Sequence, residues 1–313
     1  MEEDRSIYNK IYDNILKYLF KIVFVCIIII CIIFYSIYLF LKRNYNTYNK
    51  LINILKNIDG NSKSNFMNYG YWEKDNMTLE DANKKMCDII LKTGKLDKSK
   101  NILDVGCGFG EQDFYFADNI SSNIDAIDIN ESSIKIANDN NKKDNIKFIK
   151  KSSTDLISLN KKYDRVVSLE SAFHYNTREK FLDQTYKVLE DNGKLVMADI
   201  LYNDKTNKYD ILNYFNTKAF EKIFNIHKSN RINIETLKKQ LENIGYKNIL
   251  INDISNKTFK PYYKYFFNNV KKPDNFEVPN FMFNILKKLG DIYINKLCDG
   301  TTGFKYVIVS CDK

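Results

Sequence analysis

The sequence predicts an α/β domain built on a seven-stranded, mostly parallel sheet with helices on both faces, preceded by an N-terminal transmembrane helix. Three observations lead to this prediction. Apolar runs typical of buried strands alternate with helical stretches, as in βαβ units. A glycine-rich turn, Gly-Cys-Gly-Phe-Gly at 106–110, follows one of these runs. An uncharged apolar stretch occupies residues 22–41.

The apolar stretch 22–41 is long enough to cross a bilayer as a single helix. At 1.5 Å per residue, its length matches the roughly 30 Å of a hydrocarbon core. A signal peptide has a shorter apolar region that ends in small residues, whereas this stretch ends in Tyr-Leu-Phe-Leu and is followed by Lys42 and Arg43. Basic residues flank the stretch about equally, so the positive-inside rule gives no orientation. The expected segments are a tail (1–21), a single-pass transmembrane helix (22–41), a juxtamembrane linker (42–65) and a globular domain (66–313).

The composition excludes several classes of protein. Lysine and arginine number 48 against 39 acidic residues, a net charge of +9, but the lysines are spread along the chain, so we expect no nucleic-acid partner. None of the six cysteines has the C-x-x-C spacing of a redox or zinc site, and the only histidines are His174 and His227. We therefore expect no metal site, and a reduced, cytosolic setting for the globular domain.

Seven strands are expected in the globular domain. They are the runs 101–106, 123–129, 146–150, 163–169, 194–200, 246–253 and 304–310. One helix is expected to begin with the capping pattern at Thr78 and stop before Gly94, and others to cover 111–119 and 177–189. The segment 254–303 holds all three prolines and many aromatic residues, so it is predicted to be an insertion. Its aromatic residues form either the insertion's own core or a lid over a substrate.

The glycine-rich turn lies where open α/β sheets bind ligands, between a strand's carboxyl end and a helix. Asp104 precedes its first glycine by two positions, and Asp128 ends the next strand, near the spacing at which a carboxylate binds a ribose. The third glycine comes one residue earlier than in the dinucleotide fingerprint, and Glu111 takes its place. A carboxylate there would repel a pyrophosphate. The turn therefore favours a cationic cofactor without phosphate. The alternative is that the domain is a nucleotide-dependent oxidoreductase built on a similar sheet.

Four segments resemble the class I S-adenosyl-L-methionine (SAM)-dependent methyltransferases. They are 102–110, Asp128, 163–175 and 188–199, the last with Asp-Asn-Gly in place of the usual Pro-Gly-Gly. Within the superfamily, Leu-Glu-Ser-Ala-Phe-His at 169–174 resembles the small-molecule branch that holds sterol, tocopherol and phosphoethanolamine methyltransferases. Asn-Tyr-Gly-Tyr-Trp-Glu at 68–73 is similar to that branch's N-terminal segment, which closes over the cofactor. The likeness covers roughly 66–255 and 304–313, and implies a Rossmann-like fold with SAM as cofactor.

The resemblance also implies roles for individual residues. The glycines would pack against the methionine part of the cofactor, Asp104 would orient its amino group, and Asp128 would bind the ribose hydroxyls. Ser152 stands where the family often has an acidic residue near the adenine, so one of the next three residues must serve there. The predicted cofactor-binding residues are Asp104, Gly106, Cys107, Gly108, Gly110, Asp128, Ile129, Ser153, Thr154, Asp155, Glu170 and Tyr71.

His174 and Glu170 are the predicted catalytic residues. His174 follows the fourth strand, where a neutral imidazole suits proton removal; the alternative is a histidine that only caps a helix or bonds a loop. Glu170 ends that strand, where it either faces the acceptor or binds the cofactor's amino group. No Asn/Asp-Pro-Pro-aromatic motif, typical of enzymes that methylate bases or glutamine, follows the strand. We therefore expect a small, lipid-like acceptor, with a non-catalytic SAM-binding membrane scaffold as a further alternative.

Overall fold

A computed structural model describes residues 65–203, 226–269 and 303–313, together with positions 217, 218, 221, 280, 281, 283, 284, 287 and 288. All of them belong to one compact unit, Ile58–Lys313. The predicted tail and transmembrane helix, and the linker up to residue 64, lie outside the described residues. Within the described ranges, no helix is both long enough and apolar enough to cross a membrane.

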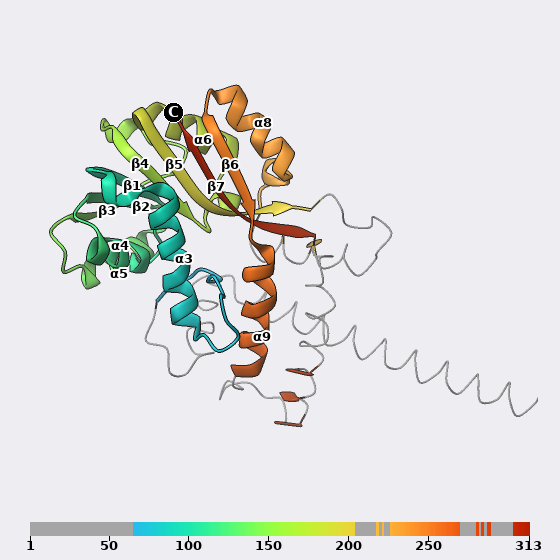
Figure 1. The fold of residues 1–313 in the computed structure, drawn as a ribbon. Helices are drawn as coiled ribbons and strands as arrows, with labels where there is room; N and C mark the ends of the chain where they lie inside the picture. Colours follow the sequence, from blue (N-terminus) through green and yellow to red (C-terminus); the bar gives the residue numbers. More distant parts are fainter. Residues whose placement is uncertain are drawn as a thin grey trace, which may run out of the picture. The chain divides into compact units, whose positions relative to one another are not determined.

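The described strands form one seven-stranded sheet in the order β3-β2-β1-β4-β5-β7-β6 (Figure 1). β7 pairs antiparallel with β5 and β6, and the other pairings are parallel. This confirms the predicted mostly parallel sheet. The strands are β1 (Asn101–Val105), β2 (Asn123–Asp128), β3 (Ile146–Lys150), β4 (Tyr163–Leu169), β5 (Leu189–Tyr202), β6 (Lys247–Asp253) and β7 (Phe304–Asp312).

Helices cover both faces of the sheet, as predicted (Figure 1). On one face, residues of α3, α4 and α5 share a core cluster with Ile102 of β1. On the other face, residues of α6 and α8 share a cluster with Leu103 and Val105, because successive strand residues point to opposite faces. The helices are α3 (Leu79–Gly94), α4 (Glu111–Asn119), α5 (Glu131–Asn140), α6 (Arg178–Val188) and α8 (Ile234–Ile244).

Local signals account for the helix ends. At the start of α3, the Thr78 side chain accepts from the Asp81 amide, and the Asp81 carboxylate accepts from the Thr78 amide, forming the predicted capping box. The helix runs through Gly94 rather than stopping before it, and Lys95 ends it in a left-handed conformation. α6 stops at Val188 because β5 begins at the next residue, five positions earlier than predicted.

The insertion 254–303 begins with a short 3-10 helix, Ser255–Lys257, which is followed by α9 (Phe259–Asn269). Rings of Phe259 and Tyr262 pack edge-on against Tyr69, with centroid distances of 5.4 and 4.6 Å. Phe259 is buried. Phe259 therefore packs in the core cluster of the whole domain rather than in a separate core of the insertion. Most of 270–302 lies outside the described residues, so the substrate lid stays a prediction.

Candidate active site

The glycine turn after β1 has a backbone that only glycine adopts easily. Gly106, Gly108 and Gly110 have φ angles of 82°, 56° and 79°, in the left-handed region. A Cβ at Gly106 would lie 1.9 Å from Ser171 Oγ, and one at Gly110 would lie 2.4 Å from Phe148 Cζ. The turn therefore needs glycine for both conformation and space.

Hydrogen bonds join the turn to the end of β2. The amides of Gly106 and Cys107 donate to the carbonyl of Ile127 at 2.8 and 3.0 Å. The Gly108 amide donates to Asp128 Oδ2 at 3.0 Å. Burial raises the pKa of Asp128, and its backbone hydrogen bonds oppose that shift. The structure thus brings Asp128 to the glycine turn, as predicted, and the next residue, Ile129, is 72% exposed beside it.

Two observations at the turn fit a cofactor with a cationic amino group. A Cβ on Gly108 would meet only the flexible end of the Met67 side chain, with Cε at 2.2 Å. Above this glycine the space is therefore bounded by a side chain that can move and not by backbone. Beneath the turn, Asp104 is fully buried. Its Oδ2 accepts from Gln112 Nε2 at 2.6 Å, while its Oδ1 has no hydrogen-bond partner. SAM carries both an ammonium and a sulfonium group, and the carboxyl groups of Asp104 and Asp128 beside the turn would attract these cations.

The loop after β3, predicted to lie near the adenine, is bonded mainly to itself. Asp155 is exposed and pairs with Lys151 at 2.8 Å, which holds the pKa of the aspartate below its usual range. The Thr154 amide donates to Ser152 Oγ at 3.3 Å. Ser153 is half-buried. The roles of Ser153, Thr154 and Asp155 in cofactor binding stay predictions.

The N-terminal segment of the domain runs along α3 toward the site. The Tyr71 amide donates to the carbonyl of Ala82 at 2.8 Å, and the Tyr69 amide donates to Glu170 Oε1 at 2.7 Å. Tyr71 itself is half-buried, and its predicted contact with the cofactor stays untested. The segment is therefore fastened to the end of β4 through Tyr69.

Glu170 occupies an unusual position at the end of β4. Its φ is 51°, a left-handed conformation that is uncommon for glutamate. Its Oε1 accepts from the Tyr306 hydroxyl as well as from the Tyr69 amide. Burial raises the pKa of Glu170 to about 8, and these two hydrogen bonds oppose the shift. Without a cationic ligand nearby, this carboxyl is therefore mostly neutral at pH 7.

Aromatic rings enclose the side of Glu170 that faces Tyr69. The Tyr69 ring has Phe259, Tyr262, Tyr263 and Tyr306 as edge-on neighbours, with centroid distances from 4.6 to 6.3 Å. Burial raises the pKa of Tyr69 and of Tyr306 well above the usual value. Their hydroxyls therefore remain protonated donors at neutral pH. We refer to these five residues as the tyrosine enclosure.

His174 lies at the same edge of the sheet as the glycine turn. It ends a short 3-10 helix, Ala172–His174, immediately after β4. Because β4 pairs parallel with β1, the carboxyl ends of the two strands lie side by side. The imidazole is exposed, and its ring centroid lies 4.1 Å from that of Phe173. The structure thus brings His174, Glu170 and the glycine turn to one edge of the sheet.

A buried network of hydrogen bonds holds the backbone on both sides of His174, and it was not predicted from the sequence. The Asn230 side chain donates to the carbonyls of Phe173 and Tyr175 at 3.1 and 2.6 Å. Arg178 donates to the Asn230 carbonyl at 2.9 Å and to Asp199 Oδ2 at 2.6 Å. All three polar side chains of the network, on Asn230, Arg178 and Asp199, are almost completely buried. Asp199 ends a segment that resembles the superfamily, but no local pattern marks Asn230.

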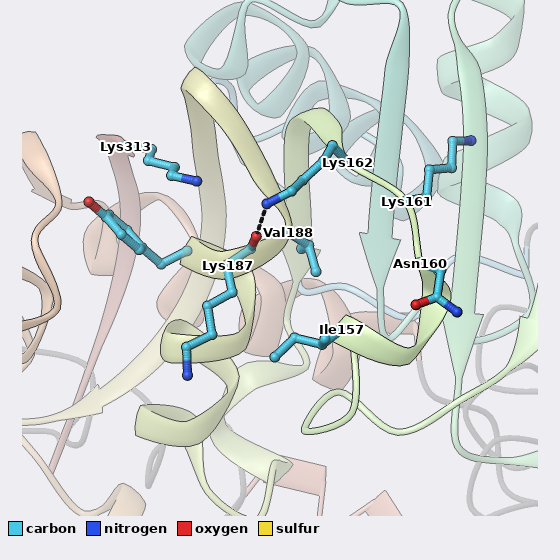
Figure 2. A pocket seen from close by; sticks show the side chains of 8 residues that line it. Ile157, Asn160, Lys161, Lys162, Lys187, Val188 and Lys313 are labelled. Atoms are coloured by element: carbon cyan, nitrogen blue, oxygen red, sulfur yellow. Dashed lines mark hydrogen bonds between the residues drawn. The ribbon is translucent and has the colours of Figure 1, made fainter.

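A cavity of about 670 Å³ lies at the opposite edge of the sheet (Figure 2). It is lined by residues that precede β4 and by the end of α6. Its lysines already have partners. Lys162 donates to the Lys187 carbonyl at 2.5 Å, Lys187 pairs with Asp183 at 2.7 Å, and Lys313 donates to the Leu189 carbonyl at 2.8 Å. This cavity is separate from the residues predicted to act in the site.

Comparison with known protein families decides between the alternatives left by the glycine turn. The family model for mycolic acid cyclopropane synthetase matches residues 61–224, just over half of the chain. The chain belongs to this family. The resemblance to class I SAM-dependent methyltransferases is thereby confirmed. The nucleotide-dependent oxidoreductase, the first alternative, is rejected.

Individual relatives agree with the family assignment. Erythromycin 3''-O-methyltransferase of Saccharopolyspora erythraea is 33% identical over 141 residues, covering 44% of this chain and 46% of the relative. The chain spans about half the length of the curated relatives it matches first.

Solved structures share the fold. The cyclopropane synthase MmaA2 of Mycobacterium tuberculosis has a TM-score of 0.63 at 15% identity, with coverage of 80% of this chain and 90% of that one. Phosphoethanolamine N-methyltransferase 2 of Haemonchus contortus, solved with SAM, has a TM-score of 0.63 at 14% identity, covering 87% and 59%. At these identities, the likeness concerns the fold alone.

Proposed function

We propose that this chain is a membrane-anchored, SAM-dependent methyltransferase that acts on a small, lipid-like or amphipathic acceptor. The observation that supports it best is the meeting of the glycine turn, Asp128, Glu170 and His174 at one edge of the sheet. Relatives of the chain are named for methyl transfer to erythromycin and to phosphoethanolamine, and for cyclopropane synthesis on mycolic acid. All of these are small or lipid-like compounds.

The glycine turn and Asp128 would hold SAM, whose sulfonium supplies an electrophilic methyl group when it is bound. His174 accepts the proton that a hydroxyl or amine acceptor must lose. Its exposed imidazole is accessible to an acceptor, and the network around Asn230 fixes the backbone on either side. Glu170 is neutral at pH 7 in the absence of ligand, and a cation beside it would favour its ionised form. It therefore serves either the acceptor or the cofactor's amino group.

Two features favour a lipid-like acceptor. The tyrosine enclosure presents apolar ring faces beside the single carboxyl of Glu170, a combination that suits a molecule with one polar end. The predicted helix 22–41 would keep the domain within a linker's reach of the bilayer, where such molecules are concentrated. We propose that the domain faces the cytosol, where SAM is supplied.

The experiment is to incubate membranes that contain the full chain with labelled SAM and to identify the extracted compound that carries the label. His174→Ala should lower turnover by about two to four decades and leave SAM affinity nearly intact. His227→Asn is the matched control, because His227 is exposed and its side chain caps the short helix Lys228–Asn230, a role that asparagine can keep; its turnover should equal wild type.

Three results would count against the proposal. Label in protein or RNA would reject the small-molecule acceptor. Full SAM binding without any labelled product would favour the non-catalytic scaffold. Release of the chain from membranes by sodium carbonate, or protection of its C-terminal domain from protease added to right-side-out microsomes, would reject the anchor or its orientation.

A further inference from the structure

Two fully buried carboxyl groups lie beneath the glycine turn. Asp104 belongs to β1, and its neighbours Ile102 and Gln112 place it under the face covered by α3 and α4. Asp113 lies in the first turn of α4. Both side chains are 0% exposed. Asp113 has no assigned role in the proposed function.

If both groups were ionised, their oxygens would have too few hydrogen-bond donors nearby. Gln112 donates to Asp104 Oδ2 at 2.6 Å. Asp104 Oδ1 and both oxygens of Asp113 are buried with no hydrogen-bond partner. An unpaired buried carboxylate is strongly unfavourable, and a buried carboxyl that cannot find a donor takes up a proton instead. One proton held between the two groups supplies a donor that two carboxylates lack.

The proton belongs mainly to Asp113. Burial and the charge of Asp104 raise the pKa of Asp113 well above its usual value. Burial also raises the pKa of Asp104, to about 6, while the hydrogen bond from Gln112 and the neighbouring Asp113 carboxyl oppose the shift. Near neutral pH, Asp113 is therefore the neutral donor, and Asp104 is the carboxylate that accepts from it.

No cation among the described residues compensates this carboxylate. The titratable groups that face the pair are Cys87 from α3, Cys107 from the turn, Asp128 from β2 and Tyr175 from the loop after β4. Burial raises the pKa of Tyr175 well above its usual value, so its hydroxyl is neutral. Burial raises the pKa of both thiols, so they are neutral. The pair therefore leaves one negative charge beneath the turn, held in place by Gln112 and by the shared proton.

We propose that Asp113 is a positioning residue for cofactor binding: it shares a proton with Asp104 and so keeps the Asp104 carboxylate ionised and oriented toward the ammonium group of SAM. The inference rests on the proposed placement of SAM at the glycine turn. It predicts that SAM affinity falls as the pH drops below about 6, because protonation of Asp104 removes the charge that attracts the ammonium.

The test measures SAM binding to the full chain by titration calorimetry between about pH 5 and 8. Asp113→Leu removes the donor, so affinity at pH 7 should fall about tenfold or more, and the pH midpoint of binding should move upward. Asp113→Asn keeps a donor to Asp104, so it should recover most of that affinity and a midpoint near the wild-type one. Asp88→Asn is the control: its carboxylate, which accepts from Tyr115 at 2.7 Å, is nearby but outside the pair.

A second measurement detects the shared proton without any cofactor. In a Glu170→Gln background, where the neutral Glu170 carboxyl contributes no band, infrared spectroscopy at neutral pH should show the carbonyl band of a neutral carboxylic acid, and adding Asp113→Asn should remove it while adding Asp88→Asn should keep it. This measurement shows whether Asp113 holds a proton even if Asp113→Leu does not fold. If the same band is lost in Asp88→Asn, or if it persists in Asp113→Asn, the proposal that Asp113 shares a proton with Asp104 is refuted.

The outcomes separate this inference from the cofactor placement. If Asp128→Ala weakens SAM binding but Asp113→Leu retains the wild-type affinity and midpoint, the placement stands and the role of Asp113 is refuted. If Asp113→Asn loses as much affinity as Asp113→Leu, a neutral donor is insufficient and the inference also fails. If Asp128→Ala binds SAM as wild type does, the placement itself is wrong.

Discussion

Replacing Glu170 with glutamine should flatten the pH dependence of the protein's stability. Burial raises the pKa of Glu170 to about 8 from a usual value of about 4.3. Between these values, the native state holds a proton on this carboxyl that the unfolded chain has released. The contribution of Glu170 to stability therefore falls as the pH rises, by up to about 1.4 kcal/mol per pH unit.

The expected size follows from the surroundings of the side chain. Over two pH units, the upper limit is about 2.7 kcal/mol, and the half-buried position of Glu170 reduces this to about 1–2 kcal/mol through solvent screening. Glutamine keeps an oxygen that can accept from the Tyr69 amide and the Tyr306 hydroxyl, but it cannot ionise. The free energy of unfolding of Glu170→Gln minus that of wild type should therefore increase by about 1–2 kcal/mol as the pH is raised from 5.5 to 7.5.

Urea denaturation of the full chain provides the assay. Trp72 is the only tryptophan; it is 4% exposed, and its Nε1 donates to the Tyr69 carbonyl at 2.9 Å, so its fluorescence reports on this part of the site. Glu190→Gln, at an exposed position of β5, should show no comparable gain. A difference between Glu170→Gln and wild type that does not change with pH would refute the reasoning, because it would show that Glu170 is ionised in the folded protein over this whole range.

Three further substitutions test the geometry of the site. Asp128→Ala should weaken SAM binding by about one to two decades in calorimetry, because the ribose hydroxyls lose a charged acceptor; wild-type affinity would show that the cofactor binds elsewhere. Gly110→Ala should lower the free energy of unfolding by more than about 1 kcal/mol, measured by urea denaturation, since its φ of 79° and the 2.4 Å approach to Phe148 both oppose a Cβ. Asn230→Ala should lower kcat at least tenfold with little change in SAM affinity, because it frees the backbone on both sides of His174; equal losses in both would indicate a general structural defect.

Much of the fold was predictable because its signals are local. The bounds of β3 and β4 agree with the sequence prediction. In β3, apolar residues at 146, 148 and 149 stand among lysines, and in β4 the two valines and Leu169 are buried. The capping box of α3 and the glycine turn were predictable for the same reason: each depends on residues within a few positions of one another. β5 extends further than predicted because its ends pair with Tyr163 and with Phe304, which lie far from it in the sequence.

The site was predictable only where a motif marks it. The glycines, Asp128 and His174 stand in segments that resemble the superfamily, and the structure brings them to one edge of the sheet. Tyr306 and Asn230 are 136 residues from Glu170 and 57 residues from Phe173 along the chain. Their contacts arise only when β7 and the loop before α8 are packed in place, so no local pattern could have shown them.

The glycine turn and the loop that carries His174 are connected by buried hydrogen bonds. The Tyr175 hydroxyl donates to the Val105 carbonyl at 2.6 Å, just before the first glycine of the turn, and lies 3.0 Å from Ser168 Oγ. On the same side, Ser171 leaves no room for a Cβ at Gly106. The backbone of Tyr175 is held in turn by Asn230. These contacts connect β1, β4 and the loop before α8, so buried hydrogen bonds help to set the position of the His174 backbone relative to the glycine turn. Methyl transfer depends on such alignment of donor and acceptor. If His174 is the base that we propose, these contacts would hold its backbone in place even though its side chain is exposed.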